Sequence, residues 1–582
     1  MTFRLRAMRA FALLVGFFLM GVVLLAAMAV LDWLVLTKLY SARAAWVEGG
    51  LLTVTFLLAV AILRGMFAFL RAGRLPPVTD AVAVTPQDQP ELWEQIRAAA
   101  EATGQQPPDE LYLVTEVNAG VAEQSRWLGL LPGRRRMFLG LPLLAGLTPA
   151  QLRAVLVHEF GHVSNLDTRL GAVTMRGRTA LIHTVEAFRD GSTHFHYLIG
   201  VLYVGYARMF LRTTQSVARH QELAADRMAA RHAGRDATAS ALRALPVLAS
   251  AYAHYLETYA SMGGSQETEE GAGGVAGTDG AEAAGQALPP VGEVYGGFRR
   301  LLAARTGEGL TALAAGQRPP RPHPYDSHPP LAERIALIEE LPTDAERDPH
   351  SNTPHQPTPA LALLRDTDHV FAALEARTLP PAVAQLPRKS WDELTMARAI
   401  ADAESWSRPL QVAVARTLRS AEQKAEQKAE QTTEQKTDGP APVRRGTTPS
   451  GPLNPANTPR TPNSPLPGLE ETLDAFDRGL LWMEVADRMP KPYQAARLIG
   501  PSARNFIRPR IFDGLAGLIH LRLAESGQAQ PDIAWSGRPG LVLPDSWEKG
   551  MDDALDAAVA DTPDTAPLRA LLAAPHPLAK AT

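Results

Sequence analysis

Cysteine is absent from this chain of 582 residues. Disulfide bonds, thiolate metal ligands and catalysis by a nucleophilic thiol are therefore excluded. Basic residues are not in excess either, since 58 lysines and arginines are balanced by 61 acidic residues. A nucleic-acid-binding protein would show a basic face or stripe, so we expect no nucleic-acid partner.

Charge is nearly missing from two long segments near the N-terminus. Residues 11–36 contain Asp32 as their only charged residue, and residues 51–70 contain only Arg64. At about 1.5 Å per residue, the first segment is long enough to cross a hydrocarbon core of ~30 Å. With a short polar turn between them, the two segments predict a transmembrane helical hairpin within residues 1–75, and so a lipid membrane as a partner.

Each apolar segment has an alternative interpretation. A cleaved signal peptide would suit Ala27-Met28-Ala29, but the apolar run continues to Leu36, beyond the about 7–15 residues of a signal core. A buried core helix is the alternative for the second segment. Lysines and arginines are slightly more frequent outside the hairpin than in its turn, so we expect a multi-pass cell-membrane protein with both ends in the cytoplasm. A third apolar stretch, residues 197–211, is short and predicts a buried or interfacial helix.

A helix is predicted to begin at Thr148 and Pro149, which suit the N-cap and first helical positions. His158 and His162 lie four residues apart in this helix, so both imidazoles face the same side, as two ligands of one metal ion must. Glu159 is placed where its carboxylate can take a proton from a metal-bound water. A chance pair of surface histidines is the alternative.

A catalytic zinc site needs three protein ligands and one open position. Two later segments place an aspartate one helical turn after a glutamate, namely Glu186 with Asp190 and Glu222 with Asp226. In either segment the glutamate can bind zinc while the aspartate hydrogen-bonds a ligand histidine and fixes its tautomer. The two alanines that precede Asp226 favour the second segment, because they allow a close helix approach. A solvated helix charge is the alternative for Glu222.

Three ordered motifs resemble the HtpX and CAAX-prenyl protease family of integral-membrane zinc endopeptidases. They are V-H-E-F-G-H-V at residues 157–163, E-L-A-A-D at residues 222–226 and S-H-P-P-L-A-E-R-I at residues 327–335. Upstream, Asn118-Ala119 and the strand-like residues 136–140 are also similar to that family. The resemblance covers roughly residues 75–341.

The resemblance implies one zinc ion per chain, held by His158, His162 and Glu222. It implies Glu159 as the general acid and base of peptide hydrolysis.

Three further roles also follow from the resemblance. Asp226 would hydrogen-bond a ligand histidine, and His328, with Arg334 nearby, would lie on the substrate side of the zinc. A donor there stabilises the oxyanion of a tetrahedral intermediate. A helix-capping role is the alternative for His328. Asp167 is either an outer residue of the site or the end of a helix.

We therefore expect a mainly α-helical chain. Residues 76–341 would form an α+β zincin core with a small sheet, in which residues 136–141 make the edge strand and bind an extended peptide by β-addition. The other regions are a flexible insertion at 262–290, a helical extension at 342–420, a disordered linker at 421–467 and a small helical domain at 468–582.

These features together predict a membrane-anchored zinc metalloendopeptidase that acts on protein or peptide substrates with its catalytic domain in the cytoplasm. The HtpX-type resemblance suggests membrane-protein quality control. The alternatives are a signalling protease that cuts one dedicated regulator and a non-catalytic membrane scaffold stabilised by zinc. Glu159 argues against the scaffold, because a purely structural site does not need that carboxylate.

Overall fold

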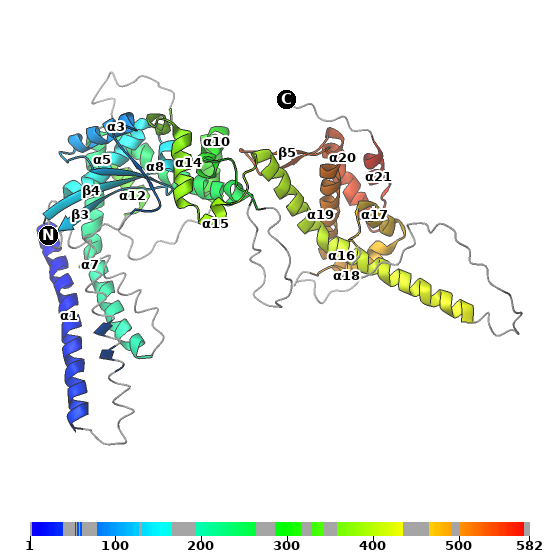
Figure 1. The fold of residues 1–582 in the computed structure, drawn as a ribbon, viewed down its shortest axis with the longest axis horizontal. Helices are drawn as coiled ribbons and strands as arrows, with labels where there is room; N and C mark the ends of the chain where they lie inside the picture. The colour runs from blue at the N-terminus through cyan, green and yellow to red at the C-terminus, as the bar shows by residue number, and fades with distance from the viewer. Residues whose placement is uncertain are drawn as a thin grey trace, which may run out of the picture. The chain divides into compact units, whose positions relative to one another are not determined.

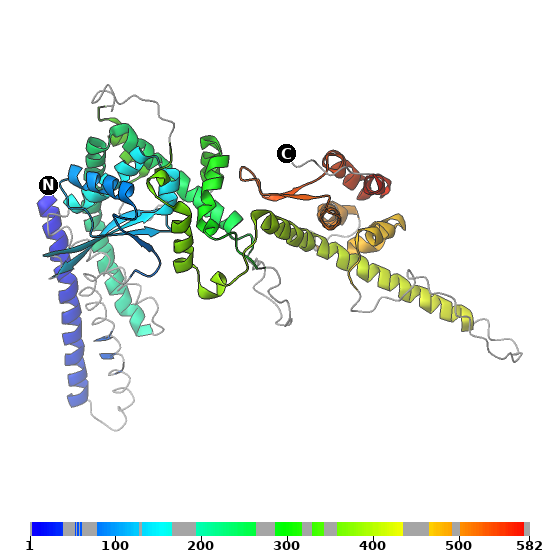
Figure 2. The same ribbon diagram turned by 45° about the horizontal axis from the view of Figure 1, so that its top comes forward.

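The computed structural model describes residues 3–38, 53, 55–56, 59–60, 78–126, 131–165, 194–263, 286–316, 329–342, 358–434, 465–491 and 501–574. They belong to two compact units (Figures 1 and 2). The first unit comprises residues 1–260 and 291–385, and the second comprises residues 261–290 and 386–582. The described residues are mainly helical with a small sheet, which confirms that part of the predicted fold class.

The sheet of the first unit has four strands in the order β1-β2-β4-β3. They are β1 (Val82–Val84), β2 (Glu110–Val114), β3 (Ala119–Arg126) and β4 (Leu131–Gly140). β2 and β4 run parallel, whereas the β1–β2 and β3–β4 pairs are antiparallel. Leu113 and Leu139 are partners in the parallel pair, and both are fully buried. The sheet therefore has an apolar centre.

The prediction that residues 136–141 form the edge strand is wrong. Residues 136–140 lie inside the sheet, because β4 pairs with β2 on one side and with β3 on the other, and Leu141 already belongs to the next helix. The edge beside β4 is β3, whose sequence A-G-V-A-E-Q-S-R lacks the alternation of apolar residues that marks a strand. Only the long pairing with β4 identifies it.

Helices form most of the remaining described residues of the first unit. They are α1 (Phe3–Lys38), α3 (Pro90–Ala102), α4 (Leu141–Gly146), α5 (Pro149–Asn165), α7 (His194–His232), α8 (Arg235–Tyr255), η2 (Leu256–Ala260), α9 (Glu293–Gly296), α10 (Phe298–Ala304), α11 (Gly307–Gly316), α12 (Leu331–Glu339), η3 (Ala360–Leu363), α14 (Thr367–Thr378) and α15 (Pro381–Ala384). α5 packs against α3, α7, α8 and β3. This central helix is therefore held on several sides.

α1 covers the first apolar segment and lies beside α7 (Figure 1). The Tyr206 hydroxyl donates a hydrogen bond to the carbonyl of Leu13 at 2.6 Å, and Thr55 donates to the carboxylate of Asp32 at 3.1 Å. Residues 197–211 are part of α7, a helix of 39 residues. Among the helices that the structure describes, none has the combined length and apolar character of a membrane span. The transmembrane hairpin remains a prediction.

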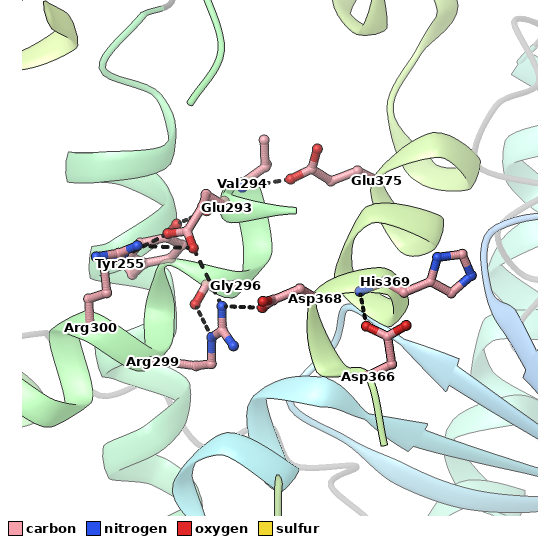
Figure 3. A network of polar contacts seen from close by, with 10 residues as sticks. All are labelled: Tyr255, Glu293, Val294, Gly296, Arg299, Arg300, Asp366, Asp368, His369 and Glu375. Carbon is pink, nitrogen blue, oxygen red and sulfur yellow. Dashed lines mark hydrogen bonds and ion pairs between the residues drawn. The ribbon is translucent and has the colours of Figure 1, made fainter. Parts of the chain in front are cut away.

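A polar network joins the end of α8 to α9, α10 and α14 (Figure 3). The carboxylate of Glu293 accepts a hydrogen bond from Arg300 at 2.9 Å, and its backbone carbonyl accepts one from the Tyr255 hydroxyl at 2.6 Å. The buried carboxylate of Glu375 accepts a hydrogen bond from the Val294 amide at 2.7 Å. These contacts fix the C-terminal end of α8. Residues nearer the N-terminal end of the same helix line the candidate functional site.

The second unit is built around two packed helices. Its elements are α16 (Trp391–Glu434), α17 (Leu469–Asp477), η5 (Leu481–Val485), α18 (Ala486–Arg488), α19 (Pro501–Glu525), β5 (Gln530–Asp532), β6 (Gly540–Val542), α20 (Asp545–Ala558) and α21 (Ala566–Ala573). α16 and α19 approach closely at glycines: a Cβ on Gly514 would lie 2.9 Å from Leu410, and one on Gly517 would lie 2.7 Å from the carbonyl oxygen of Ala403.

Two predicted boundaries differ from the structure. α16 continues to Glu434, so residues 421–434 are helical rather than part of a disordered linker. The A-E-Q-K repeats there consist of strong helix formers, and Lys424 lies 3.4 Å from Glu484. Residues 386–420 also pack with the C-terminal region instead of forming a separate extension. Most of the predicted linker, residues 435–464, and most of the predicted insertion, residues 264–285, lie outside the described residues.

Candidate metal centre

The helix that carries both histidines begins as expected. The side chain of Gln151 accepts a hydrogen bond from the Thr148 amide at 2.9 Å, and the Thr148 hydroxyl accepts one from the Gln151 amide at 3.3 Å. This reciprocal capping box satisfies amide groups that the first helical turn leaves without partners. It fixes where α5 starts, and so which of its residues face α7.

α5 and α7 approach each other through small residues. A Cβ on Gly161 would lie 3.1 Å from the Cα of Ala225 and 3.2 Å from its Cβ, and Ala225 is fully buried. Larger residues at this contact would push the helices apart. The close approach brings Glu222 on α7 next to the histidines on α5.

Three potential ligand groups form a compact triangle, in which Glu222 faces His158 with Oε2 and His162 with Oε1. The Nε2 atoms of His158 and His162 are 3.0 Å apart. The carboxylate of Glu222 lies 3.7 Å from His158 Nε2 and 3.5 Å from His162 Nε2. Tetrahedral zinc with bonds of about 2.1 Å would separate its ligand atoms by about 3.4 Å. The donor set, two imidazoles and one carboxylate, and these separations both fit a catalytic zinc ion.

Glu159 is the fourth group of the cluster. Ligand atoms of His158, Glu159 and His162 all lie within 4.8 Å of one another. Each of these side chains is partly accessible rather than fully buried. A carboxylate so close to the metal position can exchange a proton with a water molecule there.

Asp226 lies behind His158, on the side away from the ligand triangle. Its carboxylate is 3.0 Å from His158 Nδ1, and Asp226 is only 2% exposed. Burial alone would raise the pKa of Asp226, but hydrogen bonds from Arg334 and His158 lower this pKa to about 2. The ionised carboxylate holds the Nδ1 proton of His158 and leaves Nε2 free to bind a metal.

Arg334 reaches the site from α12. Its guanidinium donates two hydrogen bonds to Asp226, at 2.6 and 2.7 Å, and lies 3.4 Å from the carboxylate of Glu222. Burial would lower the pKa of Arg334, but the hydrogen bonds to Asp226 and the charges of Asp226 and Glu222 raise it. One buried cation thus compensates two buried carboxylates, which would otherwise be costly to remove from water.

The cluster lines a cavity of about 360 Å³. Its other walls come from the start of β3 and from α8, including Ala119, Thr238, Leu242 and Leu245. The residues of α8 were not predicted. Their apolar spacing is ordinary for a core helix, and only the packing of α8 against α5 turns them toward the site.

Six of the seven predicted site residues come together in this centre. They are His158, Glu159, His162, Glu222, Asp226 and Arg334. The seventh, His328, lies outside the described residues, as do Asp167, Glu186 and Asp190. The role of His328 therefore stays a prediction. The geometry of the Glu222 segment is that expected of the third ligand.

Residues 86–341 match the model of peptidase family M48. Two HtpX protease homologues, from Tropheryma whipplei strains Twist and TW08/27, are each 26% identical to this chain over 194 residues. The match covers 31% of this chain and 65% of each relative, slightly less than two thirds of their length. A crystal structure of S. mikatae Ste24p is similar at 16% identity and a TM-score of 0.26, covering 54% of this chain and 67% of that one.

All three motifs fall inside the matched range, which contains both helices of the metal centre. The resemblance to HtpX-like and CAAX-prenyl proteases that these motifs indicated is confirmed. Residues 86–341 of this chain are thus similar to peptidase family M48.

Proposed function

We propose that this protein is a membrane-anchored zinc metalloendopeptidase that hydrolyses peptide bonds in protein or peptide substrates. The observation that carries this proposal is the triangle of His158, His162 and Glu222 ligand atoms, with Glu159 beside it. The three ligands leave one position of a tetrahedral site open, as a catalytic centre requires.

Each residue of the centre has its own role in the proposed reaction. A bound zinc ion would polarise the scissile carbonyl and make a water molecule more acidic. Glu159 takes the proton of the attacking water and then gives it to the leaving amine. In the same cavity, Asp226 keeps His158 in the tautomer that presents Nε2. Arg334 holds Asp226 and Glu222 in place.

Casein cleavage by the detergent-purified protein, loaded with zinc, tests the proposal. We expect the wild type to cleave casein and a chelator to stop it. Replacing Glu159 by Gln removes the proton acceptor and should lower the rate by at least about 100-fold. The Glu159→Gln protein should keep its zinc, measured by atomic absorption, because the three ligands remain.

Glu308→Gln is the matched control, because Glu308 is exposed on α11, away from the cavity. It should leave the rate unchanged. Zinc-loaded wild type that cleaves neither casein nor itself would contradict a broadly acting peptidase. Equal rates for wild type and Glu159→Gln would contradict the role of that carboxylate.

Membrane anchoring and a quality-control role are the finer parts of the proposal. They are supported by the apolar residues 11–36 and by the relatives, which are named HtpX protease homologues. The full-length protein should stay in the membrane pellet after an alkaline wash that strips peripheral proteins. Its release by that wash would contradict anchoring. Cleavage of many unfolded membrane proteins would favour quality control, whereas cleavage of one protein would favour a signalling role.

A further inference from the structure

The second unit contains a cavity of about 520 Å³ that the proposed reaction does not use. One wall is a face of α16, and the other comes from Arg488 and Pro490 at the end of α18. Along α16 the lining residues run from Ala401 to Arg416, a distance of about 22 Å at about 1.5 Å per residue. The cavity is therefore elongated along the helix.

Positive charge dominates this cavity. Arg408, Arg416 and Arg488 line it, together with a single carboxylate, that of Glu404. Arg408 and Arg416 are exposed, and among the described residues their side chains form no hydrogen bond or ion pair. Glu404 lies one helical turn before Arg408 without pairing with it in the described structure. We name this site the arginine cavity, and its uncompensated charge suits an anionic ligand.

Arg488 is held in place at one end of the arginine cavity. Its Nη1 atom donates hydrogen bonds of 3.0 Å to the Thr417 hydroxyl and to the carbonyl and carboxylate of Glu484. The Glu484 carboxylate is shared with Lys424, which lies 3.4 Å away. Within the described part of the chain these bonds all use Nη1, so Nη2 is left for a ligand. A guanidinium that is already positioned loses less side-chain entropy on binding.

Hydrogen-bond acceptors line the other half of the arginine cavity. Pro409 lies inside α16 and has no amide hydrogen, so the Ser405 carbonyl lacks the donor that the helix would normally supply. Glu404 and Ser405 are both exposed in the cavity wall. A backbone N–H group of a bound peptide is a suitable donor for these acceptors.

The spacing of the arginines distinguishes between kinds of anion. Arg408 and Arg416 are eight residues apart on one helix, which corresponds to about 12 Å along its axis. An extended peptide covers that distance in about four residues. A single phosphate group would instead need guanidinium groups that converge on one point. Single-stranded nucleic acid stacks on aromatic side chains, and none of the described residues that line the cavity is aromatic.

We propose that the arginine cavity binds an acidic segment of a partner protein in an extended conformation. Two carboxylates of that segment, about four residues apart, pair with Arg408 at one position and with Arg416 and Arg488 at the other. Arginine clusters recognise acidic motifs in this way, because a guanidinium can donate two parallel hydrogen bonds to one carboxylate. This binding does not depend on the proposed peptidase activity, so either can fail without the other.

Fluorescence anisotropy with full-length Glu159→Gln protein in detergent tests the arginine cavity, since this variant should not cut the probe. The probe is a labelled peptide of serine and glycine with two glutamates four residues apart. We expect it to bind, and the same peptide with glutamines not to bind. Arg408→Gln combined with Arg416→Gln should raise Kd about five- to twentyfold, because one exposed ion pair contributes up to about fivefold in affinity. Added salt should also raise Kd.

Arg478→Gln combined with Arg538→Gln is the matched control, because both arginines are exposed in the second unit and neither lines the cavity. It removes the same charge and should change Kd less than about twofold. Equal weakening by the two pairs of substitutions, or no binding of the glutamate peptide, would overturn the site. Displacement of the probe by an equal concentration of inorganic phosphate or glycerol phosphate would assign the cavity to a single anion, such as a lipid headgroup. Equally tight binding of a peptide with adjacent glutamates would also overturn the extended segment.

Discussion

The α5–α7 and α16–α19 contacts both pack through glycine, and the side chains buried beside them differ. In the first unit, Gly161 lets α5 approach α7, and this contact lies beside buried Glu222 and Asp226. In the second unit, Gly514 and Gly517 let α19 approach α16. Among the described residues of that unit, the buried polar side chains are neutral hydroxyl groups, on Thr395, Ser407, Thr417, Thr472 and Thr565.

The α16–α19 contact buries only neutral groups among the described residues, so we expect it to contribute to stability alone. The α5–α7 contact positions charged groups for the proposed chemistry. Neutral hydroxyl groups are cheap to bury once hydrogen-bonded, whereas charged groups in the interior are costly and are concentrated at functional sites. In both units, glycine allows two helices to approach closely. In the first unit this approach brings together buried charged groups, which are costly to remove from water unless they are paired.

The largest effect should follow loss of the cation that compensates those charges. Arg334→Met leaves Asp226 and Glu222 buried without their guanidinium, and breaking a buried pair in this way costs about 3–5 kcal/mol. The free energy of unfolding, measured in denaturant, should fall by that amount and zinc binding should weaken. Arg243→Met is the control: its ion pair with Glu339 is about half-exposed, so the loss should stay within about 1 kcal/mol. Equal losses would contradict a special role for Arg334.

Metal removal should distinguish the two units directly. A zinc concentration of about 100 times its dissociation constant stabilises the unit that binds it by about 2.7 kcal/mol. A chelator should therefore lower the unfolding temperature of the first unit and leave that of the second unchanged, as measured by calorimetry. A parallel shift of both transitions would show that the proposed zinc site is not confined to the first unit.

Replacing the glycine at each of these two helix contacts should lower the stability by similar amounts. The two replacements should differ in their effect on zinc content and casein cleavage. Gly161→Val and Gly514→Val each force side-chain atoms into a filled space, at a cost of about 1–3 kcal/mol. Zinc content and casein cleavage should fall for Gly161→Val, because α7 carries Glu222. Both should persist for Gly514→Val. If both variants retained zinc and activity equally, the contact of α5 with α7 would not be what positions the third ligand.

The smallest effect is expected at the end of α16. Lys424 and Glu484 form an ion pair in which the lysine is 67% exposed, and exposed pairs contribute about 1 kcal/mol or less. Lys424→Ala should therefore leave the unfolding free energy of the second unit nearly unchanged. Amide hydrogen exchange should still show a helix over residues 421–434, because alanine is itself a strong helix former. Fast exchange there would show that the ion pair, and not helix propensity, orders this segment.

Local signals carried most of the site prediction. The capping residues and the four-residue spacing of His158 and His162 depend only on one helix, and E-L-A-A-D depends only on another. The edge strand was wrong because β3 is recognisable only through its partner β4. Leu242 and Leu245 were not predicted as site residues, because their sequence does not tell which helix they face. The strand order and the direction in which the α8 side chains face depend on tertiary packing, which the sequence alone does not reveal.

The long sequence separation within the metal centre has a consequence for synthesis. Arg334 follows Asp226 by 108 residues, and a ribosome that adds about 5–20 residues per second needs about 5–22 seconds to cover that distance. During this interval the nascent chain already contains both histidines and both carboxylates, but lacks the cation that compensates them. The centre is therefore completed late in translation, and a chain interrupted before residue 334 carries an incomplete site.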